Sequence, residues 1–81
     1  MTIGYCKTIT FIVQGEDDIH VFGIDLVGWK DGTYTVLDSA PALTRDWRKI
    51  CRYVDMMNRL ELSPDHFREV AQDIRYDNQR T

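Results

Sequence analysis

Three residues near the end of the chain have types and spacing that can bind a metal ion. His66, Glu69 and Asp73 recur at intervals of three and four, so in a helix they would share one side. A metal site needs further ligands, and the second histidine, His20, lies far away in the sequence. We therefore predict no metal site. Instead we expect Asp65 and Glu69 to complement the helix N-terminus and His66 to form a hydrogen bond near the cap or the preceding loop.

No nucleophile stands in a catalytic pattern. Ser63 precedes Pro64, which is typical of a helix cap and not of the Gly-x-Ser-x-Gly elbow of a hydrolase. Cys6 and Cys51 lie far apart and outside any Cys-x-x-Cys pair, so we interpret both as small, reduced hydrophobic residues. The sequence contains neither a phosphate-binding loop nor a dinucleotide fingerprint. It predicts a protein without catalytic activity and without a cofactor.

Length and composition favour one small globular domain over residues 1–81. Of its 81 residues, 43% are hydrophobic and 28% are charged, with a net charge of −3. No apolar run approaches the roughly 18 residues of a membrane helix, and the first residues alternate like a strand and unlike a signal peptide. We expect a cytoplasmic protein that has no membrane segment and a thin core, which gains stability from a partner.

The stretch from Ile19 to Val36 predicts a β-hairpin. Asp31-Gly32 separates two apolar runs, and a type I′ turn requires positive φ at both of its central residues. This turn predicts three cross-strand pairs: Trp29 with Tyr34, Val27 with Val36, and Leu26 with Leu37.

Alternation over Ile3 to Val13 predicts another strand, followed by a loop at 15–18. Gly23 indicates a bulge or a close backbone approach, with a ligand-facing glycine as the alternative. The last strand is expected from Thr33 to about Asp38, because Pro41 lacks a ladder donor. This register predicts the pairs Phe11 with Phe22, Ile9 with Ile24, and Ile12 with Val21.

Apolar residues at three- and four-residue spacing then predict two helices, over 44–61 and 63–76. Thr44 is the expected N-cap of the first, with Asp46 in its first turn, and Ser63 caps the second. Residues 77–81 are expected to fray. The expected stripes are Leu43, Trp47, Ile50, Cys51, Val54, Met57 and Leu60 in the first helix, and Phe67, Val70, Ala71 and Ile74 in the second.

The predicted fold class is α+β, with a three-stranded antiparallel meander over residues 1–38 covered on one face by a two-helix hairpin. The chain supplies apolar residues for both faces of this sheet but helices for only one. The predicted core face carries Ile9, Phe11, Val13, Phe22, Ile24, Leu26 and Leu37. The predicted outer face carries Ile12, Val21, Val27, Trp29, Tyr34 and Val36, together with Thr8, Thr10 and Asp25.

An uncovered aromatic and aliphatic cluster is typical of an interaction site. We therefore predict that Trp29, Tyr34, Val27, Val36, Val21 and Ile12 bind a protein, either a second copy in a homodimer or another partner. The alternatives are a small-ligand groove and an inert cluster shielded by Lys7 and Lys30.

Charged residues give two further hypotheses. The first is a small acidic inhibitor or nucleic-acid mimic, of phage or mobile-element type, that blocks a nucleic-acid-handling enzyme. Its negative surface would consist of Glu16, Asp17, Asp18, Asp25, Asp31 and Asp38. The second concerns a basic stripe on the first helix, interpreted as a solvated face, with docking to an acidic protein or nucleic-acid contact as alternatives. We do not expect nucleic acid as a partner, since the domain is acidic overall. The stripe consists of Arg45, Arg48, Lys49, Arg52 and Arg59.

Two segments resemble a family of small uncharacterised bacterial proteins, known as a domain of unknown function. Val21-Phe22-Gly23-Ile24-Asp25-Leu26 resembles the family's aromatic-Gly-Ile strand. The family's closing helix is similar to Asn58, Leu60, Leu62, Ser63-Pro64, His66-Phe67, Glu69-Val70 and Asp73. The resemblance covers Ile19 to Ile74 and implies a short cytoplasmic protein of a bacterium or mobile element. It implies no activity.

Overall fold

The computed structural model describes residues 1–79 and has the predicted α+β class. Three antiparallel strands form one open sheet in the order β1-β2-β3. Two helices follow them along the chain, the second preceded by a short 3₁₀ turn. The elements are β1 (Thr2–Gln14), β2 (Asp17–Lys30), β3 (Thr33–Thr44), α1 (Trp47–Arg59), η1 (Pro64–His66) and α2 (Phe67–Gln79).

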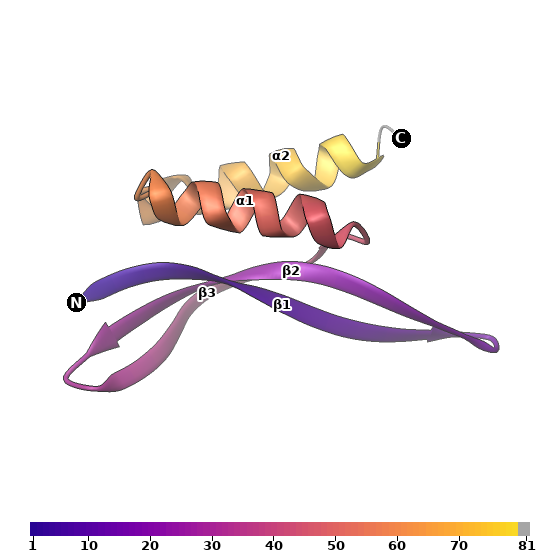
Figure 1. The fold of residues 1–81 in the computed structure, drawn as a ribbon, viewed down its shortest axis with the longest axis horizontal. Helices are drawn as coiled ribbons and strands as arrows, with labels where there is room; N and C mark the ends of the chain where they lie inside the picture. Colours follow the sequence, from indigo (N-terminus) through magenta and orange to yellow (C-terminus); the bar gives the residue numbers. More distant parts are fainter. Residues whose placement is uncertain (80–81) are drawn as a thin grey trace.

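Both helices pack on the same face of the sheet, α1 mainly against β1 and α2 against β3 (Figure 1). No element of residues 1–79 covers the other face. The β1–β2 hairpin continues well beyond the helices at one end, so the molecule is elongated, with extents of 44 × 25 × 18 Å.

The β2–β3 hairpin has the predicted turn. Asp31 and Gly32 adopt φ of 52° and 77°, and Trp29 pairs with Tyr34 as expected. Val27 also pairs with Val36, but the predicted partner of Leu26 is wrong. A β-bulge at this point adds a residue to β3, so Leu26 pairs with Asp38 and not with Leu37.

The predicted register of the first hairpin is wrong by two residues. The turn consists of Gly15 and Glu16 alone, so Gln14 pairs with Asp17, and the expected four-residue loop does not form. Gly15 has φ of 65°, which glycine adopts without strain. The observed pairs are Phe11 with His20, Ile9 with Phe22, Thr10 with Val21, and Ile12 with Ile19. Because side chains alternate with a period of two, this slip leaves every residue on its predicted face.

Strand β3 does not end near Asp38 as predicted but continues to Thr44 after an irregularity at Pro41. Ile24 pairs with Ala40 and Phe22 with Thr44, so only Gly23 lies opposite the extra residues of β3. A Cβ added at Gly23 would lie 2.5 Å from the Ala40 carbonyl oxygen. The close backbone approach predicted at this glycine is therefore confirmed.

The helix boundaries differ from the predicted ones. Asp46, not Thr44, is the N-cap of α1, and its carboxylate accepts a hydrogen bond from the Lys49 backbone N–H at 3.2 Å. Thr44 remains in β3, because its side chain is buried and its Oγ1 accepts from the Asp46 N–H. Ser63 precedes the 3₁₀ turn without a side-chain cap bond. The helix α2 includes 77–79, which were expected to fray; positions 80–81 of that prediction lie outside the described residues.

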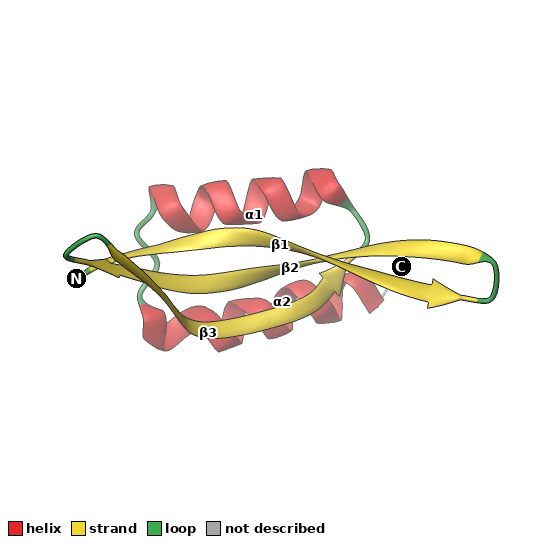
Figure 2. Ribbon diagram, turned by 90° about the horizontal axis from the view of Figure 1, so that it is seen from below, coloured by secondary structure: helices red, strands yellow, loops and turns green. Residues whose placement is uncertain are grey.

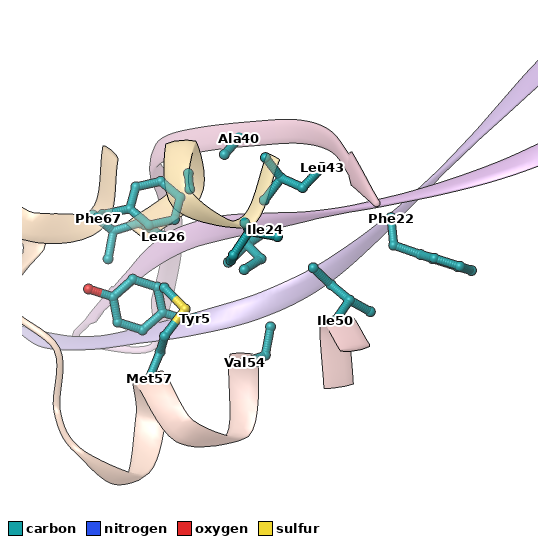
Figure 3. Close-up of a cluster of buried hydrophobic side chains, with 12 residues drawn as sticks. Tyr5, Phe22, Ile24, Leu26, Ala40, Leu43, Ile50, Val54, Met57 and Phe67 are labelled. Atoms are coloured by element: carbon teal, nitrogen blue, oxygen red, sulfur yellow. The ribbon is translucent and has the colours of Figure 1, made fainter. Parts of the chain in front are cut away.

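The core lies between the helices and the near half of the sheet (Figure 3). Most residues of the two predicted helical stripes are buried as expected, although Leu43 lies in β3 and not in the first helix. Cys51 and Val70 are only partly buried, and Trp47 and Leu60 are 45% and 69% exposed. The buried cluster consists of Tyr5, Phe22, Ile24, Leu26, Ala40, Leu43, Ile50, Val54, Met57, Phe67, Ala71 and Ile74.

Three residues of the predicted core face are exposed: Ile9 (54%), Phe11 (68%) and Val13 (72%). The cause is a difference in rise. A strand as long as β1 spans about 43 Å at about 3.3 Å per residue, whereas a helix of 13 residues spans only about 20 Å. The helices therefore cover roughly half of the hairpin. A fourth residue predicted for the core, Leu37, is also exposed, at 44%, because it lies at the bulge of β3.

Replacing Tyr5 with Phe tests one polar contact of this core. The Tyr5 hydroxyl donates a 2.7 Å hydrogen bond to the Leu62 carbonyl oxygen, and burial raises the pKa of the phenol above 10.0. We expect Tyr5→Phe to lower the free energy of unfolding by about 1 kcal/mol at neutral pH. The wild type should also lose stability as pH rises above 10.0, because the unfolded chain releases this proton first. Urea unfolding at neutral and alkaline pH measures both effects; an identical alkaline loss in the variant would contradict the second.

Candidate interaction surface

The uncovered sheet face carries a small aromatic cluster at the end next to the β2–β3 turn. The rings of Trp29 and Tyr34 meet edge to face with centroids 5.5 Å apart, as their confirmed pairing allows. Trp29 is 39% exposed, Tyr34 50% and Val36 47%, so these three predicted binding residues are open to solvent.

Two other residues predicted to bind a partner, Val21 and Val27, are buried at 8% and 0% exposure. Val27 pairs with Gly4 on one side and Val36 on the other. The Trp29 indole folds over Gly4, where an added Cβ would lie 3.2 Å from the ring. The prediction that Val21 and Val27 contact a partner is therefore wrong, because other residues of the chain already cover both side chains.

Polar groups border this cluster. Asp25 accepts a 2.6 Å hydrogen bond from the Ser39 hydroxyl. The pKa of Tyr34 is raised, first by partial desolvation of the phenol and then by the electrostatic influence of Cys6 and Asp25. The phenol of Tyr34 thus stays neutral and remains a hydrogen-bond donor throughout the physiological range.

Further exposed apolar side chains lie on the far part of the first hairpin. We call residues 8–19 the arm. Ile9, Phe11 and Val13 project from its helix-side face, and Ile12, the sixth predicted binding residue, is 40% exposed on the other face. The Phe11 ring contacts the His20 ring edge to face at 4.7 Å. The arm therefore presents apolar side chains on both faces.

A shallow apolar hollow of about 260 Å³ lies where the arm leaves the helices. The rings of Phe22 and Trp47 pack at 5.1 Å, and the Lys7 ammonium lies 5.2 Å from the Trp47 ring centroid. Sequence reasoning missed this site because it placed Trp47 inside the core stripe. The sequence did offer one signal: Trp47 lies in the first turn of the helix, and a side chain at a helix end is open to solvent on one side. The hollow is lined by Ile9, Phe11, His20, Phe22 and Trp47.

Sequence reasoning also missed a contact at the free edge of β1. The Asn58 side chain accepts a hydrogen bond from the Tyr5 N–H at 2.8 Å and donates one to the Tyr5 carbonyl at 2.9 Å. The amide of Asn58 thus pairs with β1 as another strand would. No sequence pattern predicts a contact between residues 53 positions apart.

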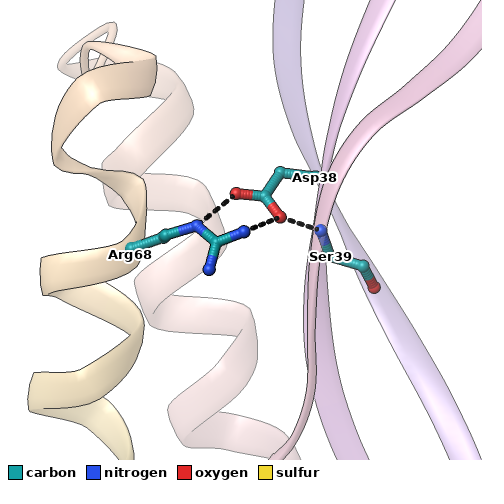
Figure 4. Close-up of polar contacts among 3 residues, drawn as sticks. All are labelled: Asp38, Ser39 and Arg68. Atoms are coloured by element: carbon teal, nitrogen blue, oxygen red, sulfur yellow. Dashed lines mark hydrogen bonds and ion pairs between the residues drawn. The ribbon is translucent and has the colours of Figure 1, made fainter.

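The predicted acidic surface is divided between separate places. Arg68 binds the Asp38 carboxylate through Nε at 3.1 Å and through a second nitrogen at 3.3 Å (Figure 4). Asp25 is bonded to Ser39 on the sheet. Glu16, Asp17 and Asp18 lie at the turn of the arm, whereas Asp31 lies at the turn at the opposite end of the sheet (Figure 2).

The predicted basic stripe is also partly paired. Lys49 forms a 2.7 Å ion pair with Asp77, and the hydrogen bond to this carboxylate is the largest cause of its raised pKa. Arg59 lies 3.9 Å from Asp55, one helical turn earlier. The remaining stripe residues, Arg45, Arg48 and Arg52, are exposed.

The candidate chemical groups do not assemble. His66 Nδ1 lies 3.7 Å from a carboxylate oxygen of Glu69, and both side chains are exposed. Within the described part of the chain, no three histidine, cysteine or acidic residues come together as metal ligands. Cys6 and Cys51 are both free thiols.

Comparison with known proteins gives no relative: no family model, curated protein or solved structure matches the chain. Neither helix of the described residues has the length and apolar character required to cross a bilayer.

Proposed function

We propose that this chain is a non-catalytic protein-interaction module that binds through the apolar side chains its helices leave uncovered. One observation supports the proposal above all. Phe11 and Val13, on an arm that extends beyond the helices, are 68% and 72% exposed. Large apolar residues gathered on one projecting element are typical of an interaction site, whereas scattered ones are ordinary.

Two surfaces are available for such binding. The first is the arm with the adjoining hollow at Trp47; the second is the cluster of Trp29, Tyr34 and Val36 on the uncovered face. The arm supports the proposal more strongly, because it has the higher exposure and an unoccupied strand edge. No specific observation favours the acidic-inhibitor alternative, since its carboxylates are dispersed and Asp38 is already paired with Arg68.

The experiment compares wild type with Phe11→Ser and Trp29→Ala after cross-linking and affinity capture from a bacterial lysate. We expect the wild type to retain a protein, either itself or another. Phe11→Ser should reduce that retention at least tenfold, because burying one large apolar side chain is worth about 1.5–3 kcal/mol. A smaller reduction is expected for Trp29→Ala.

Thermal unfolding of each variant is the control, and both transitions should remain cooperative, since each side chain is exposed. Equal retention by all three proteins, or no retention above the matrix background, would contradict the proposed function.

A further inference from the structure

We propose that the free edge of β1 pairs antiparallel with β1 of a second copy, centred on Thr10, to form a closed dimer with one continuous sheet. The inference rests on the proposed function and names the partner: another molecule of this chain. Three features support it: the unpaired backbone groups of β1, the limits of its free edge at Tyr5 and Gln14, and the uncharged sequence of the arm.

The unpaired backbone groups of β1 follow from the Asn58 contact. Because both the N–H and the carbonyl of Tyr5 bond to Asn58, this residue directs its backbone away from β2. The β1–β2 register has no bulge, so direction alternates along the whole strand. Lys7, Ile9, Phe11 and Val13 therefore direct their N–H and carbonyl groups outward in the same way. Apart from the sheet ladder, no hydrogen bond reaches their backbones within residues 1–79.

The side chains of this edge favour pairing with another strand. Natural sheets protect exposed edges with charges, proline or bulges, and long uncharged β-branched edges otherwise associate. From Thr8 to Val13 the sequence is Thr-Ile-Thr-Phe-Ile-Val, without a charge, proline or glycine. The opposite edge, β3, is interrupted from Leu37 onward by two register shifts, by Pro41 and by the Arg68–Asp38 ion pair. A two-fold axis uses the β1 edge of both copies, so this association closes at two copies and does not continue into a fibre.

The ends of the free edge select one register. Asn58 occupies the edge at Tyr5, and the strand stops at Gln14 before the turn. Centring the two-fold axis on Thr10 places Lys7 opposite the partner's Val13 and Ile9 opposite the partner's Phe11. Every outward backbone group between the Asn58 contact and the turn then has a partner. Centring on Ile9 would need the occupied edge at Tyr5, and centring on Phe11 would leave Lys7 unpaired.

This register also covers the exposed apolar residues. On the helix side, Ile9 would stand between Phe22 of its own copy and the partner's Phe11, which places the partner's ring at the hollow beside Trp47. Aromatic and β-branched cross-strand pairs of this kind stabilise sheets by roughly 0.2–1 kcal/mol each. Figure 2 shows α1 on the β1 side of the sheet and ending before the projecting hairpin, so the helix does not cover the edge of β1 along the arm. Asp18 pairs with Val13, and Val13 would face the partner's Lys7. Asp18 and the partner's Lys7 would then lie on either side of Val13, an attractive placement of opposite charges.

Disulfide trapping tests the register directly. In a background with Cys6→Ser and Cys51→Ala, Thr10→Cys should form a covalent dimer under mild oxidation. The two Cα atoms of a central non-hydrogen-bonded pair lie about 4.5 Å apart, within the roughly 4.4–6.8 Å that a disulfide spans. Thr8→Cys alone and Ile12→Cys alone should not cross-link, because each would lie about 13 Å from its own equivalent. A mixture of those two variants should cross-link, since Thr8 faces the partner's Ile12.

Sedimentation tests the backbone contribution. Phe11→Pro removes a side chain and an outward N–H, while Phe11→Ala removes the side chain alone and is the matched control. Edge pairing predicts at least about tenfold weaker self-association for the proline variant than for the alanine variant. Docking of apolar side chains alone predicts equal weakening. Thermal unfolding of both variants monitors the fold.

The inference is overturned if Thr10→Cys cross-links no better than Thr8→Cys, or if the wild type sediments as a monomer up to high micromolar concentration. A monomer that still captures another protein through Phe11 would reject the dimer and leave the proposed function standing. A monomer that captures nothing would reject both.

Discussion

Gly23→Ala should destabilise the fold by at least about 3 kcal/mol, the upper end of the cost of overpacking a well-packed site. The added Cβ would lie 2.5 Å from the Ala40 carbonyl oxygen and 2.8 Å from the Pro41 Cα. Both are backbone atoms, so relief requires the irregular part of β3 to move away from β2. In a domain of this size we expect a fall in Tm of more than about 10 °C. Thermal and urea unfolding measure the change.

Gly28→Ala is the matched control. Its Cβ would lie 2.6 Å from the Met1 Sδ, almost as close as at Gly23. That sulfur is at the end of a flexible side chain on the first residue, so a rotamer change removes the clash. The expected loss is below about 1 kcal/mol. Similar losses in the two variants would show that the backbone approach at Gly23 is not the cause.

Asn58→Asp should cost about 2–3 kcal/mol at neutral pH. The amide nitrogen that donates to the Tyr5 carbonyl would be replaced by a carboxylate oxygen, which repels that carbonyl. The contact with the Tyr5 N–H is preserved, so the variant isolates the donor half of the pair. Urea unfolding at neutral pH gives the loss directly.

The pH dependence of this variant provides a second check. Repulsion from the carbonyl raises the pKa of the introduced carboxyl in the folded state above its unfolded value. The deficit relative to wild type should therefore be largest at neutral pH and should shrink as pH falls through that folded pKa, because the protonated group can donate. Asp55→Asn on the exposed side of the same helix is the control, with an expected change within about 0.5 kcal/mol. A deficit that does not change with pH would argue against the proposed geometry.

Local sequence signals predicted much of this structure. Asp31-Gly32 gave the correct turn and two of its three pairs, since positive φ at consecutive residues has few alternatives. Periodicity gave both helices and the buried residues Ile50, Val54 and Phe67. The Leu26 partner could not be predicted, because a bulge depends on how β3 curves over the core. The predicted register of the first hairpin was wrong because this sequence can form either the two-residue turn at Gly15-Glu16 or the longer loop at 15–18.

The candidate surface was predicted less well. Trp29, Tyr34 and Val36 are exposed on the predicted face, but Val21 and Val27 are covered. The most exposed residues of the arm, Phe11 and Val13, are predicted by the sequence to lie in the core. An alternation pattern indicates which face a residue occupies. It does not indicate whether anything lies above that face.

By itself, the sequence determined the order of strands and helices, the faces of each strand and an apolar content too great for one helical layer. Those properties follow from local geometry, because side-chain direction repeats every two residues in a strand and about every 3.6 in a helix. Only the tertiary structure decided which apolar residues stay open. A strand advances about twice as far per residue as a helix, so the helices end before the arm does and leave Phe11 and the outer half of the β1 edge uncovered.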